Sequence, residues 1–251
     1  MGNGEGVSLL IGIHAVDAAL NHHPARLKTV IVAAEVRNPR VRTLAEHARR
    51  LGVEVGNEPR AALDRRCEGQ RHQDVIAEFE AANTWLESDL DTLLDAIDGP
   101  PLILVLDGVQ DPHNLGACLR TADAAGVNLV IVPKDRSAGL TPVTRRAASG
   151  AAETLPILFA TNLARVLRAL KKRGLWLVGT TDRAAQDLYQ MDLTGPLVLV
   201  MGGEGQGMRK LTAELCDFEL RIPMRGTVGS LNVSVATAVC LYEAIRQRTG
   251  A

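Results

Sequence analysis

A glycine-rich segment, MGGEGQGM at 201–208, is the first part of the chain whose residue types suggest ligand chemistry. It follows the apolar run 197–200, which predicts a strand leading into the glycines. Glycine loops after strands commonly lie against a phosphate or a nucleotide. The dinucleotide fingerprint G-x-G-x-x-G fails, because Met208 or Lys210 stands where its third glycine is required, and no Gly-Lys-Ser/Thr of a P-loop follows. The ligand must therefore be inferred from the rest of the chain.

Two further segments stand at predicted strand-to-helix junctions. They are DGVQDPHNLGACLRTA at 107–122 and IPMRGTVGSLNVSVATA at 222–238. In open parallel sheets the ligand lies beyond the carboxyl ends of the strands. These two segments and the glycine loop are therefore the three candidates for a binding site.

The elements that would position these segments form a repeated β-α pattern. Continuous apolar strands are predicted at 101–107, 128–133, 175–180, 196–202 and 218–224. Helices are predicted at 114–126, 141–152, 162–174 and 231–248. Apolar strands that alternate with helices indicate an α/β fold with a parallel sheet covered on both faces.

An acidic stretch separates this region from a smaller one. We predict a small domain at 1–76, an acidic connector at 77–99 and a large domain at 100–251. In the small domain, strands are predicted at 28–35, 53–56 and 74–80, and a helix at 38–52 with Asn38 as its cap.

Composition limits the class of protein. Hydrophobic residues make up 46% of the 251 residues and aromatic residues only 3%, so the core must consist of small aliphatic side chains. The four cysteines form no C-x-x-C motif, which favours reduced thiols in the cytoplasm. The N-terminus has no signal-peptide pattern, and no apolar run approaches the roughly 20 residues of a membrane span. We therefore expect neither secretion nor a membrane partner.

Charge is unevenly distributed and permits an RNA partner. Residues 1–75 carry a net charge of +2, residues 76–99 carry −7 and residues 100–251 carry +4. Nine arginines crowd the small domain: Arg37, Arg40, Arg42, Arg49, Arg50, Arg60, Arg65, Arg66 and Arg71. A solvated helix face is the ordinary interpretation of any one of them, but as a group they can contact phosphates.

Specific patterns occur in the three candidate segments. The first contains D-P-x-N-x-G-x-x-x-R at Asp111, Pro112, Asn114, Gly116 and Arg120, and the last contains S-L-N-V-S-V-A at 230–236. In order and spacing, the three segments resemble the motifs of the SpoU branch of the SPOUT RNA methyltransferases, over nearly the full chain. The resemblance implies a C-terminal SPOUT domain with a parallel sheet and a deep trefoil knot, preceded by a small, ribosomal-protein-like α/β RNA-binding domain.

The resemblance also implies a cofactor, S-adenosyl-L-methionine, which has no phosphate. In the family, backbone groups at positions matching Gly202, Ile222 and Leu231 hold it, and no metal is involved. Glycine suits such a loop because the backbone passes close to adenine and ribose, and because several turns need a positive φ. An ordinary strand-to-helix turn is the alternative interpretation of residues 202–207.

Arg120 is the leading catalytic candidate by resemblance, against the ordinary alternative of a surface ion pair. A ribose 2′-hydroxyl is a weak acid, so its attack on a sulfonium methyl requires removal of the proton or stabilisation of the developing charge. Guanidinium barely deprotonates, so stabilising charge is physically easier for it than acting as a base. His113 is an alternative base, but it stands at a variable position of the pattern. In this fold the arginine is expected to serve a cofactor bound by the other subunit, which implies a homodimer.

Four other polar residues each have two interpretations. Asn114 is expected to cap the helix that carries Arg120 and also to help form the active site. Glu204 is either a solvated turn residue or a carboxylate that orients Arg120 or contacts the target nucleotide. Ser230 and Asn232 either cap the last helix or form catalytic hydrogen bonds.

The resemblance implies a cytoplasmic enzyme that methylates the ribose 2′-hydroxyl of a guanosine in 23S ribosomal RNA, free or in a large-subunit precursor particle, with no DNA partner. A relative that modifies transfer RNA is one alternative. A non-catalytic RNA-binding assembly factor is another, although such a protein would not need Asn114, Arg120, Glu204 and Ser230 together.

Overall fold

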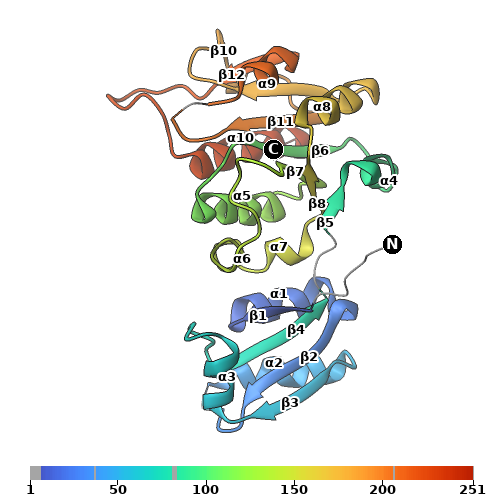
Figure 1. Ribbon diagram of the computed structural model, residues 1–251, viewed down its shortest axis with the longest axis vertical. Helices are drawn as coiled ribbons and strands as arrows, with labels where there is room; N and C mark the ends of the chain where they lie inside the picture. Colours follow the sequence, from blue (N-terminus) through green and yellow to red (C-terminus); the bar gives the residue numbers. More distant parts are fainter. Residues whose placement is uncertain (1–6, 37, 81–83, 206, 251) are drawn as a thin grey trace. The chain divides into compact units, whose positions relative to one another are not determined.

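The computed structural model describes residues 7–36, 38–80, 84–205 and 207–250 (Figure 1). The chain divides into two compact units, Met1–Ala82 and Asn83–Ala251, each built around its own sheet. Among the described residues, none of the helices has the length and apolar character needed to cross a membrane.

The first unit is a four-stranded mixed sheet with the strand order β1-β4-β2-β3. Strand β4 pairs antiparallel with β1 and β2, and β2 pairs parallel with β3. The strands are β1 (Val7–Ile11), β2 (Leu27–Ala33), β3 (Glu54–Glu58) and β4 (Val75–Glu80). The helices are α1 (Ile13–His22), η1 (Pro24–Arg26), α2 (Pro39–Arg50) and α3 (Arg60–Arg66).

Helices cover both faces of the first sheet. Apolar side chains of α1 and α2 form one core with the sheet, while Leu63 of α3 and the neighbouring Cys67 pack with Ile31 and Ile76 in a second core. The predicted cap of α2 is confirmed, since the Asn38 side chain accepts a hydrogen bond from the backbone N–H of Arg40. The three strands predicted here are present, whereas β1, α1 and α3 were missed by the sequence patterns.

The second unit is an eight-stranded sheet with the order β10-β12-β9-β11-β6-β7-β8-β5, and its strands pair in parallel. The strands are β5 (Thr84–Leu86), β6 (Leu102–Asp107), β7 (Leu129–Pro133), β8 (Ile157–Ala160), β9 (Trp176–Thr180), β10 (Gln186–Asp187), β11 (Leu197–Gly202) and β12 (Phe218–Arg221). The helices are η2 (Glu87–Asp89), α4 (Leu90–Asp95), α5 (Pro112–Ala124), α6 (Pro142–Ala148), α7 (Ala151–Thr154), α8 (Leu163–Lys172), η3 (Leu188–Gln190), α9 (Lys210–Leu215) and α10 (Val233–Thr249).

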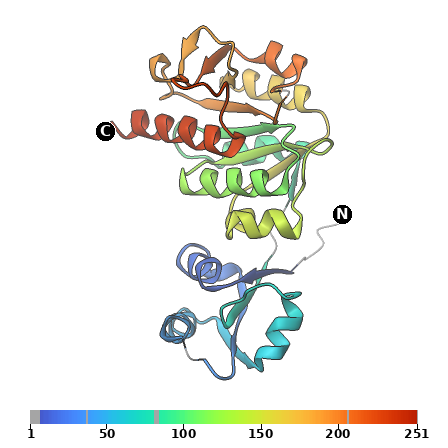
Figure 2. The ribbon, with the colours of Figure 1, turned by 90° about the vertical axis from the view of Figure 1, so that its left-hand side faces the viewer.

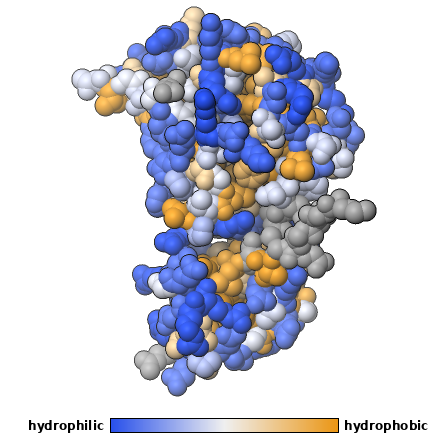
Figure 3. All heavy atoms as spheres, in the orientation of Figure 1, coloured by the Kyte–Doolittle hydropathy of each residue, from blue (hydrophilic) through white to orange (hydrophobic). Residues whose placement is uncertain are grey.

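Helices cover both faces of this sheet too, as predicted for a parallel α/β fold. Leu104 and Leu106 of β6 pack with α5, α6, α7 and α10 on one face, while Ile103 and Val105 pack with α4 and α8 on the other. The alternation follows from the two-residue period of a strand. Helices α5 and α10 lie side by side on the first face (Figures 1 and 2). The visible surface is mainly hydrophilic, with apolar side chains in scattered patches (Figure 3).

The order of strands brings distant loops together. Strand β11 lies between β6 and β9, and β12 lies between β9 and β10. Each of these two strands comes later in the sequence than both of its neighbours. Because the strands are parallel, the loops that follow β6, β9, β11 and β12 meet at one edge of the sheet. This edge contains all three candidate segments.

Some elements differ from the sequence prediction. The acidic stretch 77–99 contributes β4 to the first unit, and β5 and α4 to the second. The helix predicted at 141–152 is two helices, because Ser149 and Gly150 adopt left-handed conformations with φ of 52° and 101°. Strand β8 was missed because its four residues are too few to show a period.

Gly116 permits a close approach of α5 and α6. A Cβ at this position would lie 2.5 Å from both the Ala147 Cβ and the Thr144 carbonyl oxygen. Gly116→Ala should therefore destabilise the second unit by about 1–3 kcal/mol through overpacking, although alanine favours helix by about 1 kcal/mol. Both tryptophans, Trp85 and Trp176, belong to this unit, so their fluorescence during urea unfolding measures the change. A variant with a higher unfolding midpoint than the wild type would contradict this prediction.

Candidate active site

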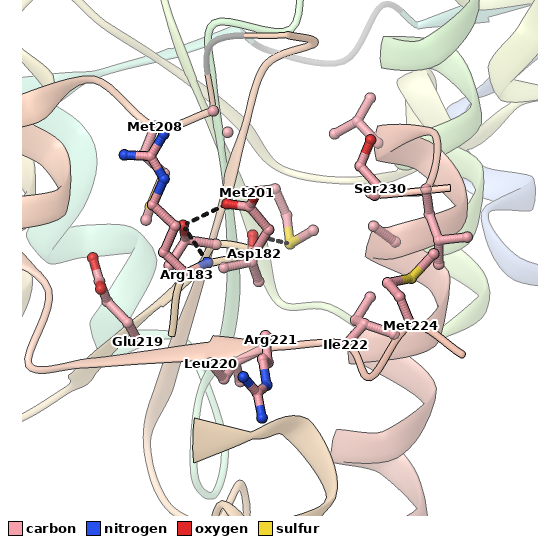
Figure 4. Close-up of a pocket in the computed structure, with 18 of the residues that line it drawn as sticks. Asp182, Arg183, Met201, Met208, Glu219, Leu220, Arg221, Ile222, Met224 and Ser230 are labelled. Atoms are coloured by element: carbon pink, nitrogen blue, oxygen red, sulfur yellow. Dashed lines mark hydrogen bonds between the residues drawn. The ribbon is translucent and has the colours of Figure 1, made fainter. Parts of the chain in front are cut away.

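A cavity of about 1140 Å³ opens at the carboxyl edge of the second sheet (Figure 4). Its walls come from the segments after β9, β11 and β12 and from the first turn of α10. Figure 4 shows Met201, Ile222, Met224 and Ser230 around this space. Six of the eight predicted site residues line the cavity: Gly202, Glu204, Ile222, Ser230, Leu231 and Asn232. The other two, Asn114 and Arg120, do not line it.

Glycine is favoured in the 201–208 loop for two different physical reasons. Gly205 and Gly207 have φ of +76° and +67°, the left-handed region that favours glycine. At Gly202 a Cβ would lie 2.2 Å from the backbone of residues 207 and 208, and at Gly203 it would lie 2.1 Å from the Gly108 carbonyl oxygen. The space next to Gly202 and Gly203 is thus filled by the protein's own backbone. Gln206 lies outside the described residues.

A chain of hydrogen bonds joins the three candidate segments. The Ser234 hydroxyl and backbone N–H both donate to Asn232 Oδ1, at 2.6 and 2.9 Å. Asn232 Nδ2 donates to Asn114 Oδ1 at 3.0 Å, and Asn114 Nδ2 donates to Glu204 Oε1 at 2.5 Å. The side-chain oxygen of Asn232 accepts from Ser234, so its N–H₂ group is the one that donates to Asn114. The side-chain oxygen of Asn114 accepts from Asn232, so its N–H₂ group donates to Glu204. The chain of donors therefore ends on the Glu204 carboxylate.

The helix caps at this site differ from the prediction at one position. Asp111, and not Asn114, caps α5, because its side chain accepts from the His113 backbone N–H at 2.9 Å. Pro112 can begin the helix since it has no N–H to leave unpaired, so Asn114 already lies inside the first turn. Its side chain is thereby free to bridge Asn232 and Glu204. Asn232 caps α10 as predicted and also takes part in the chain of hydrogen bonds.

Arg120 lies on a different side of α5 from Asn114. The two are six residues apart, which corresponds to about 120° around a helix. Arg120 is exposed and forms no hydrogen bond or ion pair with any residue that the structure describes. Glu204 contacts Asn114 and not Arg120, so the expected orientation of Arg120 by Glu204 does not occur within one chain. The exposed Arg120 side chain thus contributes nothing to the cavity lining of its own chain.

His113 is exposed and lies on the same side of α5 as Arg120, since their separation of seven positions is about two helical turns. It does not line the cavity. Neither His113 nor Arg120 therefore lines the cavity of its own chain.

Sequence patterns missed one wall of the cavity. This wall consists of Thr180, the last residue of β9, and residues 181–183 after it. The Thr180 hydroxyl donates to the Val200 carbonyl oxygen at 3.2 Å. Arg183 and Arg225 add exposed guanidinium groups to the lining. The signal was available, because a segment at the carboxyl end of a parallel strand belongs to the ligand edge.

Cysteines near the site are not nucleophiles. Burial raises the pKa of Cys118 to about 11, and burial together with the Glu219 and Asp217 carboxylates raises the pKa of Cys216 to about 12. Both thiols stay protonated near neutral pH and have no thiolate to attack with. Cys118 instead joins α5 to α10 through the Thr237 hydroxyl, at 3.6 Å.

The model of the SpoU rRNA Methylase family matches residues 101–242, which contain the whole of this cavity. The chain belongs to this family. A second model, described as RNA 2'-O ribose methyltransferase substrate binding, matches residues 9–85. Membership of the SpoU family thus accounts for the resemblance of the three segments, and the substrate-binding model falls mainly on the first unit.

Curated SpoU relatives match along nearly the whole chain. The 23S rRNA (guanosine-2'-O-)-methyltransferase RlmB of Pseudomonas syringae pv. tomato is 56% identical over 240 residues, which is 96% of each chain. The protein of the same name from Vibrio cholerae serotype O1 is 54% identical over 240 residues, covering 96% of this chain and 97% of its own.

Solved SpoU structures share the fold. AviRb from Streptomyces viridochromogenes, in complex with the cofactor AdoMet, aligns with a TM-score of 0.76 and 27% identity over 98% of this chain and 92% of its own. The tRNA-modifying TrmH/SpoU enzyme of A. aeolicus is 34% identical, with a TM-score of 0.57, and covers 65% of this chain and 84% of its own.

Proposed function

We propose that this chain transfers the methyl group of S-adenosylmethionine to the ribose 2′-hydroxyl of a guanosine in 23S ribosomal RNA. The observation that carries the proposal is the cavity at the carboxyl edge of the second sheet, which is lined by two of the family's three motifs and hydrogen-bonded to the first. Full-length relatives at more than half identity carry this activity in their names.

The cavity fits the proposed cofactor. Gly202, Ile222 and Leu231 line it together, so their backbone groups are available to adenine and ribose hydroxyls. Met201 and Met224 supply soft apolar surface beside them. The sequence of the glycine loop matches neither phosphate-binding pattern, in agreement with a nucleoside ligand. When bound, S-adenosylmethionine supplies a methyl group activated by a positively charged sulfur.

The polar residues of the site bind and orient the nucleotide that carries the 2′-hydroxyl. The 2′-oxygen forms a bond to the methyl carbon while the carbon–sulfur bond breaks, its electron pair stays on sulfur, and the hydroxyl proton leaves to solvent or a nearby acceptor. Glu204 Oε1 is occupied by Asn114, so Oε2 is the oxygen left to accept from the nucleotide. The Ser230 hydroxyl is exposed in the cavity wall and has no partner among the described residues, so it can bind the same nucleotide.

Arg120 acts on the partner subunit's site in this proposal. Its side chain is exposed and does not line its own cavity, which fits a residue that completes a site across an interface. A guanidinium there stabilises the developing alkoxide and the neighbouring phosphate, rather than removing the proton. The active unit is therefore a homodimer.

Helix α10 supports the homodimer. Val235 and Tyr242 are 48% and 52% exposed and lie seven residues apart, on the same side of the helix. Large apolar side chains on one side of a helix are better explained by a protein interface than by contact with water.

The strand order supports the trefoil knot implied by the resemblance, because β11 is inserted between β6 and β9.

The first unit would bind the ribosomal RNA. Arg66 is held by Glu58 and Glu78, and Arg60 by Asp74, so these two have structural roles. The exposed arginines whose side chains have no hydrogen bond or ion pair within the described residues are Arg40, Arg49, Arg50, Arg65 and Arg71. We assign the phosphate contacts to this second group. Arg37 lies outside the described residues.

Ribosomal RNA is favoured over transfer RNA because the relatives that match 96% of this chain carry the ribosomal name. An enzyme acting on this RNA in a bacterium works in the cytoplasm. Mapping of ribose methylation in 23S RNA from a deletion strain should show one guanosine that has lost its methyl group. Fully methylated RNA from such a strain would contradict the proposed substrate.

Calorimetry tests the cofactor directly. S-adenosylhomocysteine should bind the purified protein, while NAD and ATP should bind much more weakly, because the glycine loop has no phosphate-binding pattern. Tight NAD binding with no response to S-adenosylhomocysteine would contradict the proposal.

A further inference from the structure

Asp107, the last residue of β6, contacts both ends of the glycine loop. Its backbone carbonyl oxygen accepts from the Gly203 N–H at 2.9 Å, at the start of the loop. Its side-chain Oδ2 accepts from the Arg209 backbone N–H at 2.9 Å, immediately after the loop. One residue from a different strand thus fixes the distance between the two ends.

The Arg209 side chain completes these contacts. Its Nε donates to Asp107 Oδ1 at 2.6 Å, and its Nη2 lies 2.6 Å from the same oxygen. The Asp107 side chain is 0% exposed and that of Arg209 is 42% exposed. A buried carboxylate is costly unless it is paired and hydrogen-bonded, and here both oxygens accept from Arg209.

Among its described residues, the loop between these ends is restrained by one bridge, one backbone hydrogen bond and one side-chain contact. A bridge joins Gly203 to Gly207, and the Gly207 N–H donates to the Gly203 carbonyl oxygen at 3.1 Å. Gly205 and Gly207 stand in conformations that glycine can readily leave as well as enter. Glu204 is held by its contact with Asn114. Without the Asp107 contacts, this glycine-rich chain would sample many arrangements.

We propose that Asp107 is a positioning residue that holds the glycine loop in its cofactor-binding shape through Gly203 and Arg209. Neither Asp107 nor Arg209 lines the cavity, so both act through the loop and not by touching the ligand. A loop already ordered before binding avoids the entropy loss of ordering glycines around the ligand. This inference rests on the proposed function, since it takes S-adenosylmethionine as the ligand of the loop.

Asp107→Asn tests the proposal with the full-length protein. The amide keeps the shape, but whichever oxygen its N–H₂ replaces, that group faces at least one Arg209 donor that requires an acceptor. We expect the Kd for S-adenosylhomocysteine and the KM for S-adenosylmethionine to rise about ten- to hundredfold, the effect of losing one hydrogen bond to a charged group. The KM for RNA should stay within about twofold, since the phosphate contacts that we propose lie in the first unit and Glu204 is still held by Asn114. Arg209→Lys keeps the charge without the fork and should give an intermediate increase.

A matched control removes an ion pair far from the loop. Arg173 pairs with Asp91 and Asp95 near α4, on an exposed part of the same unit. Arg173→Met should leave both cofactor constants unchanged.

The outcomes separate this inference from the proposed function. Wild-type protein that does not bind S-adenosylhomocysteine would overturn the proposed function itself. The positioning role would be overturned if the wild type binds S-adenosylhomocysteine and folded Asp107→Asn has the same cofactor Kd and KM as the wild type. A purely structural residue lowers the amount of active enzyme and does not change those two constants. If Asp107→Asn does not fold, the cofactor Kd and KM of Arg209→Lys decide whether the positioning role holds. That variant changes the exposed partner and leaves the buried carboxylate in place.

Discussion

Arg120→Ala should reduce the rate of methyl transfer by about a hundredfold or more, the scale of losing one group that stabilises transition-state charge. The affinity for S-adenosylhomocysteine should change little, because Arg120 is proposed to act on the developing alkoxide and the neighbouring phosphate, and not on the cofactor. Arg120→Lys should recover little activity, since an ammonium cannot reproduce the planar fork of a guanidinium. Single-turnover kinetics with saturating cofactor and RNA measure the step directly.

Arg168→Ala is the matched control. Arg168 is an exposed arginine of α8, and that helix packs on the opposite face of the sheet from α5. Removing it changes the charge equally and should leave turnover close to that of the wild type. Turnover near the wild-type rate in Arg120→Ala would exclude the arginine and transfer the role to His113, for which His113→Ala is the corresponding test.

The location of Arg120 was partly readable from the sequence. The period of about 3.6 residues per turn already places Asn114 and Arg120 on different sides of one helix. A single active site containing both residues is therefore difficult to build from one chain. The sequence could not show what each side faces, because the partners of Asn114 lie 90 and 118 residues away. Contacts at such separations depend on the strand order, which local patterns do not encode.

Elements with a strong local signal were predicted well, and those without one were not. The strands β6, β7, β9 and β11 are continuous apolar runs, and the structure confirms them. Strand β5 is a three-residue edge strand inside an acidic stretch, so its neighbours suggested a connector. Its place beside β8 results from tertiary pairing that overrides local composition.

The glycine pattern shows the same limit. Its positive φ values at Gly205 and Gly207 could be expected, since glycine commonly marks such positions. The close approach of Gly203 to Gly108 could not, because the two residues are 95 positions apart in sequence. They directly follow β11 and β6, which are adjacent only in the folded sheet. Family resemblance identified the right residues here, while the physical reason for two of the glycines came from the structure.

A mixed dimer provides the sharpest test of the shared site. One subunit carries Arg120→Ala, and the other carries Gly202→Ala, whose added methyl group would lie 2.2 Å from the backbone of residues 207 and 208 and must displace the cofactor loop. Each homodimer should be nearly inactive, the first for lack of the arginine and the second for lack of cofactor binding. Calorimetry with S-adenosylhomocysteine must first show that Gly202→Ala homodimers have lost the cofactor.

Activity should return in the mixed dimer to about half of the wild-type value per dimer, if the two sites act independently. The reason is geometric: when Arg120 serves the partner's cavity, one site receives both defects and the other receives neither. If Arg120 and the cavity that it serves belonged to the same chain, each site would keep one defect and no activity would return.

Co-expression with two different tags isolates the mixed dimer without relying on subunit exchange, and size-exclusion chromatography checks that it is a dimer. An inactive mixed dimer would contradict independent shared sites, and a fully active monomer would remove the need for a second subunit. Recovery to half would show that Arg120 of one subunit serves the glycine loop of the other, and would explain why Arg120 does not line the cavity of its own chain.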